Sequence, residues 1–267
     1  MYAFEYHRPH TLTGAIAELE KEDAKALAGG MTLLPTMKQR LAAPSALVEL
    51  KDVPELKGLA RDGDNLVIGA STRHVEVASS PVVKSAIPAL AKLAAGIGDA
   101  HVRNRGTIGG SLANNDPAAD YPAAALALGA TIVTSKRRIA AQDFFKGLFE
   151  TALEPGELIT QVSFPVPQKA AYMKFANPAS RYALVGVFVA QTAGGVRVAV
   201  TGAGENGVFR SQPLEAALSA NFSPAAVDGA SVPASTTTVR SQARSRSSTA
   251  MTRARPSSKR CILWAWA

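Results

Sequence analysis

The sequence contains a single cysteine, Cys261, among its 267 residues. One thiol excludes an intrachain disulfide and any iron–sulfur or zinc site that is built on several thiolates. No stretch reaches the roughly 18 consecutive apolar residues of a membrane span. The first residues show neither the basic nor the apolar region of a secretory signal. The sequence therefore predicts a cytoplasmic protein without a membrane span.

Acidic residues are missing from the end of the chain. Residues 230–267 hold seven of the 29 Lys and Arg residues and none of the 21 Asp and Glu residues, which leaves 22 cations and 21 anions elsewhere. The excess positive charge thus lies in a Ser/Thr/Arg-rich tail, and the nearly neutral remainder has no basic stripe that would indicate a nucleic-acid partner. The abrupt change predicts that this tail is disordered or is a frameshifted reading of the gene.

Common catalytic motifs are also missing. Neither of the two glycine pairs in the first half of the chain forms part of a G-x-G-x-x-G fingerprint, and no G-x-x-x-x-G-K-[ST] or G-x-S-x-G occurs. These absences argue against a P-loop and a hydrolase nucleophile. The four histidines show no metal-ligand spacing with a carboxylate or the cysteine. We expect neither a metal site nor a catalytic residue.

The pattern of apolar residues predicts strands that alternate with helices up to Pro165-Val166-Pro167, with one continuous helix over 82–96. Beyond these prolines, the pattern indicates a three-stranded antiparallel meander followed by a short helix. The strands of this meander are expected at 171–175, 183–191 and 196–202. We therefore predict an α+β protein with a first domain at 1–167 (two α/β subdomains), a second α+β domain at 168–229 and the tail at 230–267.

The two glycine pairs, Gly29-Gly30 and Gly109-Gly110, lie about eighty residues apart and are the most informative feature. Each follows an apolar run and comes shortly before a hydroxyl residue. This pattern is typical of a turn whose backbone N–H groups approach a phosphate without a Cβ in the way. A single pair is equally typical of an ordinary strand–turn–helix corner. Two pairs predict one pyrophosphate that is held from two sides.

Polar side chains are dense just after the second glycine pair. Between Thr107 and Asp120, six Thr, Ser, Asn and Asp side chains supply donors and acceptors within fourteen positions. Asp120 could accept hydrogen bonds from sugar-like hydroxyls, as acidic residues do near nucleotide riboses. Capping and Asx turns around the nearby prolines are the alternative explanation. The density of these groups beside a glycine pair favours a binding loop.

The two glycine segments, their spacing, and the later Leu-x-Pro-Gly-Glu-Leu-Ile stretch resemble the FAD-binding medium subunit of molybdenum hydroxylases, the xanthine dehydrogenase and carbon monoxide dehydrogenase family. The resemblance covers about residues 1–228. It implies a two-subdomain FAD-binding fold of the p-cresol methylhydroxylase/vanillyl-alcohol oxidase type, followed by a C-terminal domain with a three-stranded antiparallel sheet and helices. Asn115 stands where many members have histidine.

The resemblance also implies which residues bind FAD. Segments 25–32 and 107–111 would hold the pyrophosphate, and Asp120 would bind the ribityl or phosphate-linked region. The full set of implied FAD-binding residues is Lys25, Ala28, Gly29, Gly30, Met31, Thr32, Ile97, Thr107, Ile108, Gly109, Gly110, Ser111, Asp120, Ile159, Lys174 and Tyr182.

The remaining implied roles concern the flavin end of the cofactor. Ile97 would pack on the cofactor, and Ile159 would contact the isoalloxazine ring through its backbone. Lys174 would lie near the carbonyl edge of the flavin and favour the anionic reduced form. Tyr182 matches a position where members place an aromatic or small polar group beside the ring.

The resemblance further implies partner subunits. A [2Fe–2S] small subunit would deliver electrons and a molybdopterin large subunit would oxidise the substrate, in a dimer of heterotrimers. One alternative is a self-sufficient flavin oxidase of the same superfamily, although no acid–base constellation for a substrate is visible. A second alternative is a polyanion-binding module, which depends on the basic tail alone.

Overall fold

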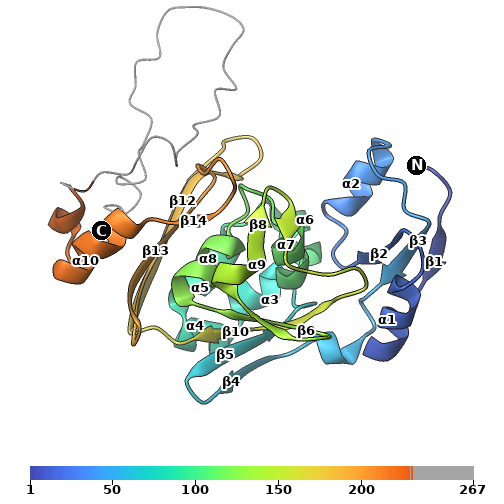
Figure 1. Ribbon diagram of the computed structural model, residues 1–267, viewed down its shortest axis with the longest axis horizontal. Coiled ribbons are helices and arrows are strands. Elements are labelled where there is room, and N and C mark those ends of the chain that lie inside the picture. Colours follow the sequence, from blue (N-terminus) through green and yellow to red (C-terminus); the bar gives the residue numbers. More distant parts are fainter. Residues whose placement is uncertain (229, 231–267) are drawn as a thin grey trace, which may run out of the picture.

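The computed structural model describes residues 1–228 and 230. Its strands form three sheets that lie side by side, together with one short two-stranded hairpin (Figure 1). The first sheet is parallel, with strand order β1-β3-β2. This N-terminal unit consists of β1 (Glu5–His7), α1 (Leu12–Leu19), β2 (Ala24–Leu27), α2 (Leu33–Lys38), β3 (Ala46–Glu49) and the 3₁₀ turn η1 (Pro54–Leu56).

The second sheet is antiparallel and has the order β4-β5-β10-β6-β7, so a strand from late in the sequence occupies its centre. Its helices lie on one face, above the strands in Figure 1. The strands are β4 (Leu59–Asp62), β5 (Asn65–Gly69), β6 (Thr131–Thr134), β7 (Arg138–Ala140) and β10 (Ile159–Pro165). The helices are α3 (His74–Ser79), α4 (Pro81–Ala86), α5 (Pro88–Ala95), α6 (Ala100–Arg105), α7 (Ile108–Asn114), α8 (Tyr121–Leu128) and α9 (Ala141–Phe144).

Helix α8 is the centre of the core. All eight of its residues are buried, which is the pattern of a helix that is covered on every side. It contacts β10 of the second sheet and also β12 and β13 of the third. Because four of its residues are alanine, both neighbours can approach closely. The helix therefore fixes the position of Asp120, its N-cap residue.

The third sheet is antiparallel, with order β11-β12-β13-β14. The three predicted strands are present, and a two-residue fourth strand is added to them. The elements of this part are β11 (Lys169–Ala176), β12 (Ala183–Thr192), β13 (Gly195–Thr201), β14 (Phe209–Arg210), α10 (Gln212–Ala220) and the 3₁₀ turn η2 (Pro224–Val227). One face of this sheet joins the core around α8, and the other packs on α10.

Two sequence patterns do not form the structures that they usually indicate. The continuous helix expected over 82–96 is broken into α4 and α5, because Ile87 precedes Pro88 and has a non-helical backbone (φ −141°, ψ 78°). The stretch Gly202–Gly207 matches G-x-G-x-x-G. It links two antiparallel strands instead of a strand and a helix, so it lacks the context of a dinucleotide-binding turn.

The division into domains at 167 and 168 remains a prediction, and the 230–267 tail lies outside the described residues except for Ala230. No helix in the described part of the chain is long and apolar enough to cross a membrane.

Candidate functional site

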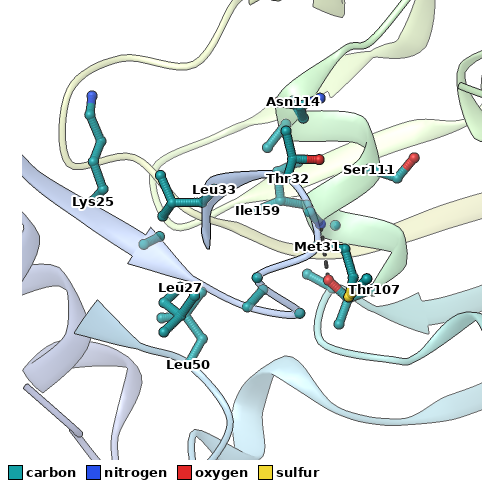
Figure 2. A pocket seen from close by; sticks show the side chains of 18 of the residues that line it. Lys25, Leu27, Met31, Thr32, Leu33, Leu50, Thr107, Ser111, Asn114 and Ile159 are labelled. Carbon is teal, nitrogen blue, oxygen red and sulfur yellow. Dashed lines mark hydrogen bonds between the residues drawn. The ribbon is translucent and has the colours of Figure 1, made fainter. Parts of the chain in front are cut away.

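A cleft of about 1120 Å³ runs between the first and second sheets. The β2–α2 segment, helix α7 and the segment leading into β10 all contribute to its lining (Figure 2). Lys25 reaches the cleft from β2, whereas Ser111 and Asn114 reach it from α7. The cleft therefore gathers segments that are far apart in the sequence.

The first glycine loop presents unpaired backbone donors to this cleft. Gly30 has a φ of +69°, a left-handed conformation that favours glycine. Its carbonyl accepts a hydrogen bond from the Leu34 N–H at 3.2 Å, which ties the loop to α2. Within residues 1–228, the N–H groups of 29–32 have no hydrogen-bond acceptor. Four successive amides are thus available to an anion.

The two glycine segments meet directly. A Cβ on Gly29 would lie 2.2 Å from the carbonyl oxygen of Arg105 and 2.7 Å from the Cα of Gly106. A Cβ on Gly110 would lie 3.8 Å from the Cβ of Ala28. The glycines therefore allow the two backbones to approach each other, and this contact sets the position of the loop relative to α7.

The second glycine pair corrects the expectation of a turn. Gly109 and Gly110 form the first turn of α7, and the Thr107 hydroxyl caps this helix by accepting from the Gly110 N–H at 3.2 Å. The Gly109 N–H donates to the Ala70 carbonyl at 2.9 Å, and a Cβ on Gly109 would lie 2.6 Å from the Cβ of Ala70. Since these amides are already paired, this pair serves close packing of the backbone.

A buried ion pair stands at the start of α8. The Lys174 ammonium lies 3.0 Å from the carboxylate of Asp120, which also accepts a hydrogen bond from the Tyr172 hydroxyl. Burial raises the pKa of the Asp120 carboxyl, and Lys174 and Tyr172 act against this rise. Asp120 is 5% exposed, so the two partners from β11 compensate a charge that water cannot reach.

The loop between α5 and α6 is held at three successive carbonyls. Lys174 Nζ donates to the Gly96 carbonyl at 2.7 Å. Arg103 Nη1 donates to the carbonyls of Ile97 and Gly98 at 3.0 and 2.8 Å. These bonds fix Ile97 at the cleft, which it lines.

The Pro-Gly-Glu stretch is anchored by the Glu157 side chain. Its carboxylate accepts from Arg137 Nε at 3.1 Å, from the Thr134 hydroxyl at 2.6 Å and from the Glu154 N–H at 2.8 Å. Burial acts to raise the pKa of Glu157, but these three donors together outweigh it and lower the pKa to about 2. The anchored segment continues into β10, whose first residue, Ile159, lines the cleft.

The cleft brings together most of the residues that the sequence predicted to bind a cofactor. Tyr182 lines it too, with 48% of its surface exposed. Two predicted residues do not line it. Ile108 is fully buried in the core, and Lys174 reaches this region through its bonds to Asp120 and Gly96.

Sequence reasoning did not single out three side chains that shape this region. They are Tyr172, Arg103 and Phe149. Tyr172 stands two residues before Lys174, and an alternating strand places both on one face. That spacing is a signal that could have found Tyr172. Arg103 and Phe149 carry no local motif.

The residues of the cleft fit FAD. The four unpaired amides at 29–32 suit a doubly negative pyrophosphate, and Lys25 adds a nearby cation. The Gly29 contact leaves no space for a side chain where the loop approaches the end of α6 at Arg105 and Gly106. At the Asp120 end, the exposed ring of Tyr182 offers an apolar surface to a planar group.

Comparison with known proteins also points to an FAD-binding protein. Residues 2–167 match the family described as the FAD binding domain in molybdopterin dehydrogenase. The chain is 40% identical to the carbon monoxide dehydrogenase medium chain of Afipia carboxidovorans, over 72% of this chain and 70% of that one. It is 37% identical to the nicotine 6-hydroxylase medium subunit of Paenarthrobacter nicotinovorans, over 75% of each chain.

Solved structures show the same relationship. A chain of carbon monoxide dehydrogenase from Hydrogenophaga pseudoflava superposes with a TM-score of 0.78 at 37% identity, covering 85% of this chain and 84% of that chain. A chain of quinoline 2-oxidoreductase from Pseudomonas putida 86 gives a TM-score of 0.78 at 32% identity, covering 86% and 87%. The predicted α+β FAD-binding fold is confirmed. The chain belongs to the family of FAD-binding medium subunits of molybdenum hydroxylases, which are oxidoreductase subunits.

Proposed function

We propose that this chain is the electron-transfer subunit of a molybdenum hydroxylase complex. It accepts electrons from a [2Fe–2S] subunit and passes them to an external acceptor, while a molybdopterin subunit oxidises the substrate. The observation that carries this proposal is a large cleft with unpaired amides on its first glycine loop, in a chain whose one cysteine cannot hold a cluster. Bound FAD supplies redox chemistry, and the protein holds and tunes it.

The pyrophosphate is assigned to the first glycine loop. Gly29, Gly30, Met31 and Thr32 donate backbone N–H groups to it, because these amides have no acceptor among the described residues. The Ser111 hydroxyl approaches from α7 on the other side. Ala28 and Gly110 line the junction of the two segments. The Thr107 hydroxyl is already used as a cap, so we assign it to positioning.

The flavin end is assigned to the region around Asp120. Tyr182 and Ile97 offer apolar surface to the ring, and Ile159 approaches it at the start of β10. Asp120 balances the charge of Lys174 at 3.0 Å. Lys174 therefore acts on the reduced flavin as one end of a local dipole and not as an isolated positive charge.

The assembly is a proposal that draws on the relatives. Their names describe medium chains and medium subunits, which indicates complexes of several chains. We assign to this chain a small [2Fe–2S] partner and a large molybdopterin partner, in a cytoplasmic dimer of heterotrimers.

The test has two parts. The purified full chain is incubated with FAD and passed through a desalting column, and one FAD per chain is expected from the flavin absorption band. A pull-down from the source cells is expected to recover a protein with an iron–sulfur absorption spectrum. A chain that retains no FAD, or that binds FAD but recovers no iron–sulfur protein, contradicts the proposal.

A further inference from the structure

The hairpin of β8 (Phe145–Gly147) and β9 (Glu150–Thr151) carries two exposed apolar side chains at its tip. Leu148 is 44% exposed and Phe149 is 58% exposed. Of the two, only Phe149 lines the cleft. The backbone of Phe149 has a φ of +59°, a left-handed conformation that is unfavourable for a bulky residue. A large apolar ring is thus held at the cleft by a strained backbone.

Asn115 fixes this tip from the end of α7. Its side-chain Nδ2 group donates to the carbonyls of Gly147 and Glu150 at 2.7 and 2.9 Å, and its main-chain carbonyl accepts from the Phe149 N–H at 3.2 Å. Asn115 is 2% exposed and has a φ of +42°, a conformation that asparagine tolerates well. Three hydrogen bonds from one residue therefore determine where Phe149 lies.

Phe149 is not the only exposed aromatic side chain at this end of the cleft. Tyr182 also lines it, and its pKa is raised by burial and by the charges of Asp116 and Asp120. Tyr182 thus lies near Asp116, the residue that follows Asn115. We call the hydrogen bonds that Asn115 makes to residues 147, 149 and 150 the clamp. Two aromatic rings beside the same short segment suit a planar aromatic ligand, since aromatic rings attract one another when stacked or tilted.

We propose that Phe149 packs against the flavin ring and that Asn115 is the positioning residue that holds it there. This inference rests on the proposed function, because it requires FAD in the cleft. FAD binding covers the exposed phenyl ring of Phe149. The hydrogen bonds of Asn115 hold the strained backbone of Phe149 in the same conformation before FAD binds. The clamp therefore lowers the cost of ordering this side chain when the cofactor binds.

The test compares the full chain with six variants, of which four are single substitutions that probe the ring, its neighbour and Asn115, and the other two are Phe149→Gly and the Asn115→Ala/Phe149→Ala double variant. Phe149→Ala removes the ring, Phe149→Tyr keeps it, and Leu148→Ala is the matched control at the neighbouring tip position. Asn115→Ala removes the two side-chain hydrogen bonds to Gly147 and Glu150 and keeps the main-chain bond to the Phe149 N–H. Each protein is titrated with FAD, and the dissociation constant and the fluorescence of bound flavin are measured. Aromatic contact quenches flavin emission, so fluorescence reports the contact separately from stability.

We expect Phe149→Ala to weaken FAD binding about 3- to 10-fold and to raise the fluorescence of the bound flavin. Phe149→Tyr and Leu148→Ala should match the parent protein. Asn115→Ala should resemble Phe149→Ala, and the double variant should show little further loss. A Phe149→Gly variant should melt no lower than Phe149→Ala, because glycine relieves the positive φ, yet bind FAD equally weakly.

The outcomes separate this inference from the proposed function. If the parent chain binds no FAD, the proposed function fails. If the parent binds FAD but Phe149→Ala keeps its affinity and its fluorescence, the assignment of Phe149 is wrong. An Asn115→Ala chain that fails to fold does not affect this decision, because the Phe149 variants and the Leu148 control decide it.

Discussion

The substitution Gly29→Ala tests the contact between the two glycine segments. The added Cβ would lie 2.2 Å from the Arg105 carbonyl oxygen and 2.7 Å from the Cα of Gly106. Both are backbone atoms, so no side-chain rotation can relieve the overlap. An ordinary contact needs roughly 3.4 Å or more, so the segments must separate by roughly 1 Å. Overpacking of this kind costs about 1–3 kcal/mol.

Separation of the two glycine segments should also weaken FAD binding. The unpaired amides at 29–32 belong to the displaced loop, so we expect FAD affinity to fall by at least about tenfold, or ~1.4 kcal/mol. The melting temperature of the FAD-free protein should fall by roughly 2–4 °C for each kcal/mol lost. Thermal unfolding and a flavin fluorescence titration measure the two effects separately.

Gly194→Ala is the matched control. Its added Cβ would meet Thr192 Oγ1 at 3.7 Å and Arg197 Nη2 at 3.9 Å, both ordinary contacts. Its stability should stay within about 0.5 kcal/mol of the parent, as for most surface substitutions. A Gly29→Ala protein that melts and binds FAD like the parent and this control would refute the reasoning.

Two further predictions concern buried charges. Lys174→Met leaves Asp120 without its cation and should destabilise the protein by about 3–5 kcal/mol at neutral pH. Burial raises the pKa of Asp120, and the loss of Lys174 raises it further. The folded variant therefore holds a proton on Asp120 that the unfolded chain releases, so its free energy of unfolding falls as the pH rises. Urea unfolding should show that the difference in this free energy between the parent and the variant grows from pH 5 to pH 8. Glu157→Gln weakens the bonds to Arg137 and Thr134 and should cost about 1–3 kcal/mol. The pKa of Glu157 is about 2 in the folded protein against 4.5 ordinarily, so the parent's advantage should be complete above pH 4.5 and disappear as the pH falls toward 2. If the loss of unfolding free energy stays constant between pH 5 and pH 8 for Lys174→Met, or between pH 4.5 and pH 2 for Glu157→Gln, the corresponding prediction is contradicted.

Local signals in the sequence were sufficient for much of the fold. Thr11 precedes an apolar helical pattern, and its hydroxyl caps α1 by accepting from the Gly14 N–H. The Asp-Gly-Asp-Asn stretch at 62–65 joins β4 and β5 with a positive φ at Gly63. Such features depend on residues within one turn of each other, and the sequence displays them directly.

Contacts between distant segments could not be predicted in the same way. Gly109 and Gly110 are poor helix formers, yet they stand in the first turn of α7. At Gly109, Ala70 lies too close for any side chain, and at Gly110 a Cβ would lie 2.9 Å from the capping hydroxyl of Thr107. The Tyr172–Asp120 bond joins residues 52 positions apart, and the clamp on Phe149 acts from Asn115 across more than thirty positions. These positions follow from packing, which no local pattern encodes.

The most direct test of the central claim is the order of reduction in the purified complex after rapid mixing with its reducing substrate. The iron–sulfur absorption should bleach first and the flavin band should follow. In a complex from which FAD has been removed, the cluster should become reduced and stay reduced in the presence of the external acceptor. A cluster that is reoxidised at the parent rate without FAD would contradict the account, because electrons would then leave the complex by a route that bypasses this chain.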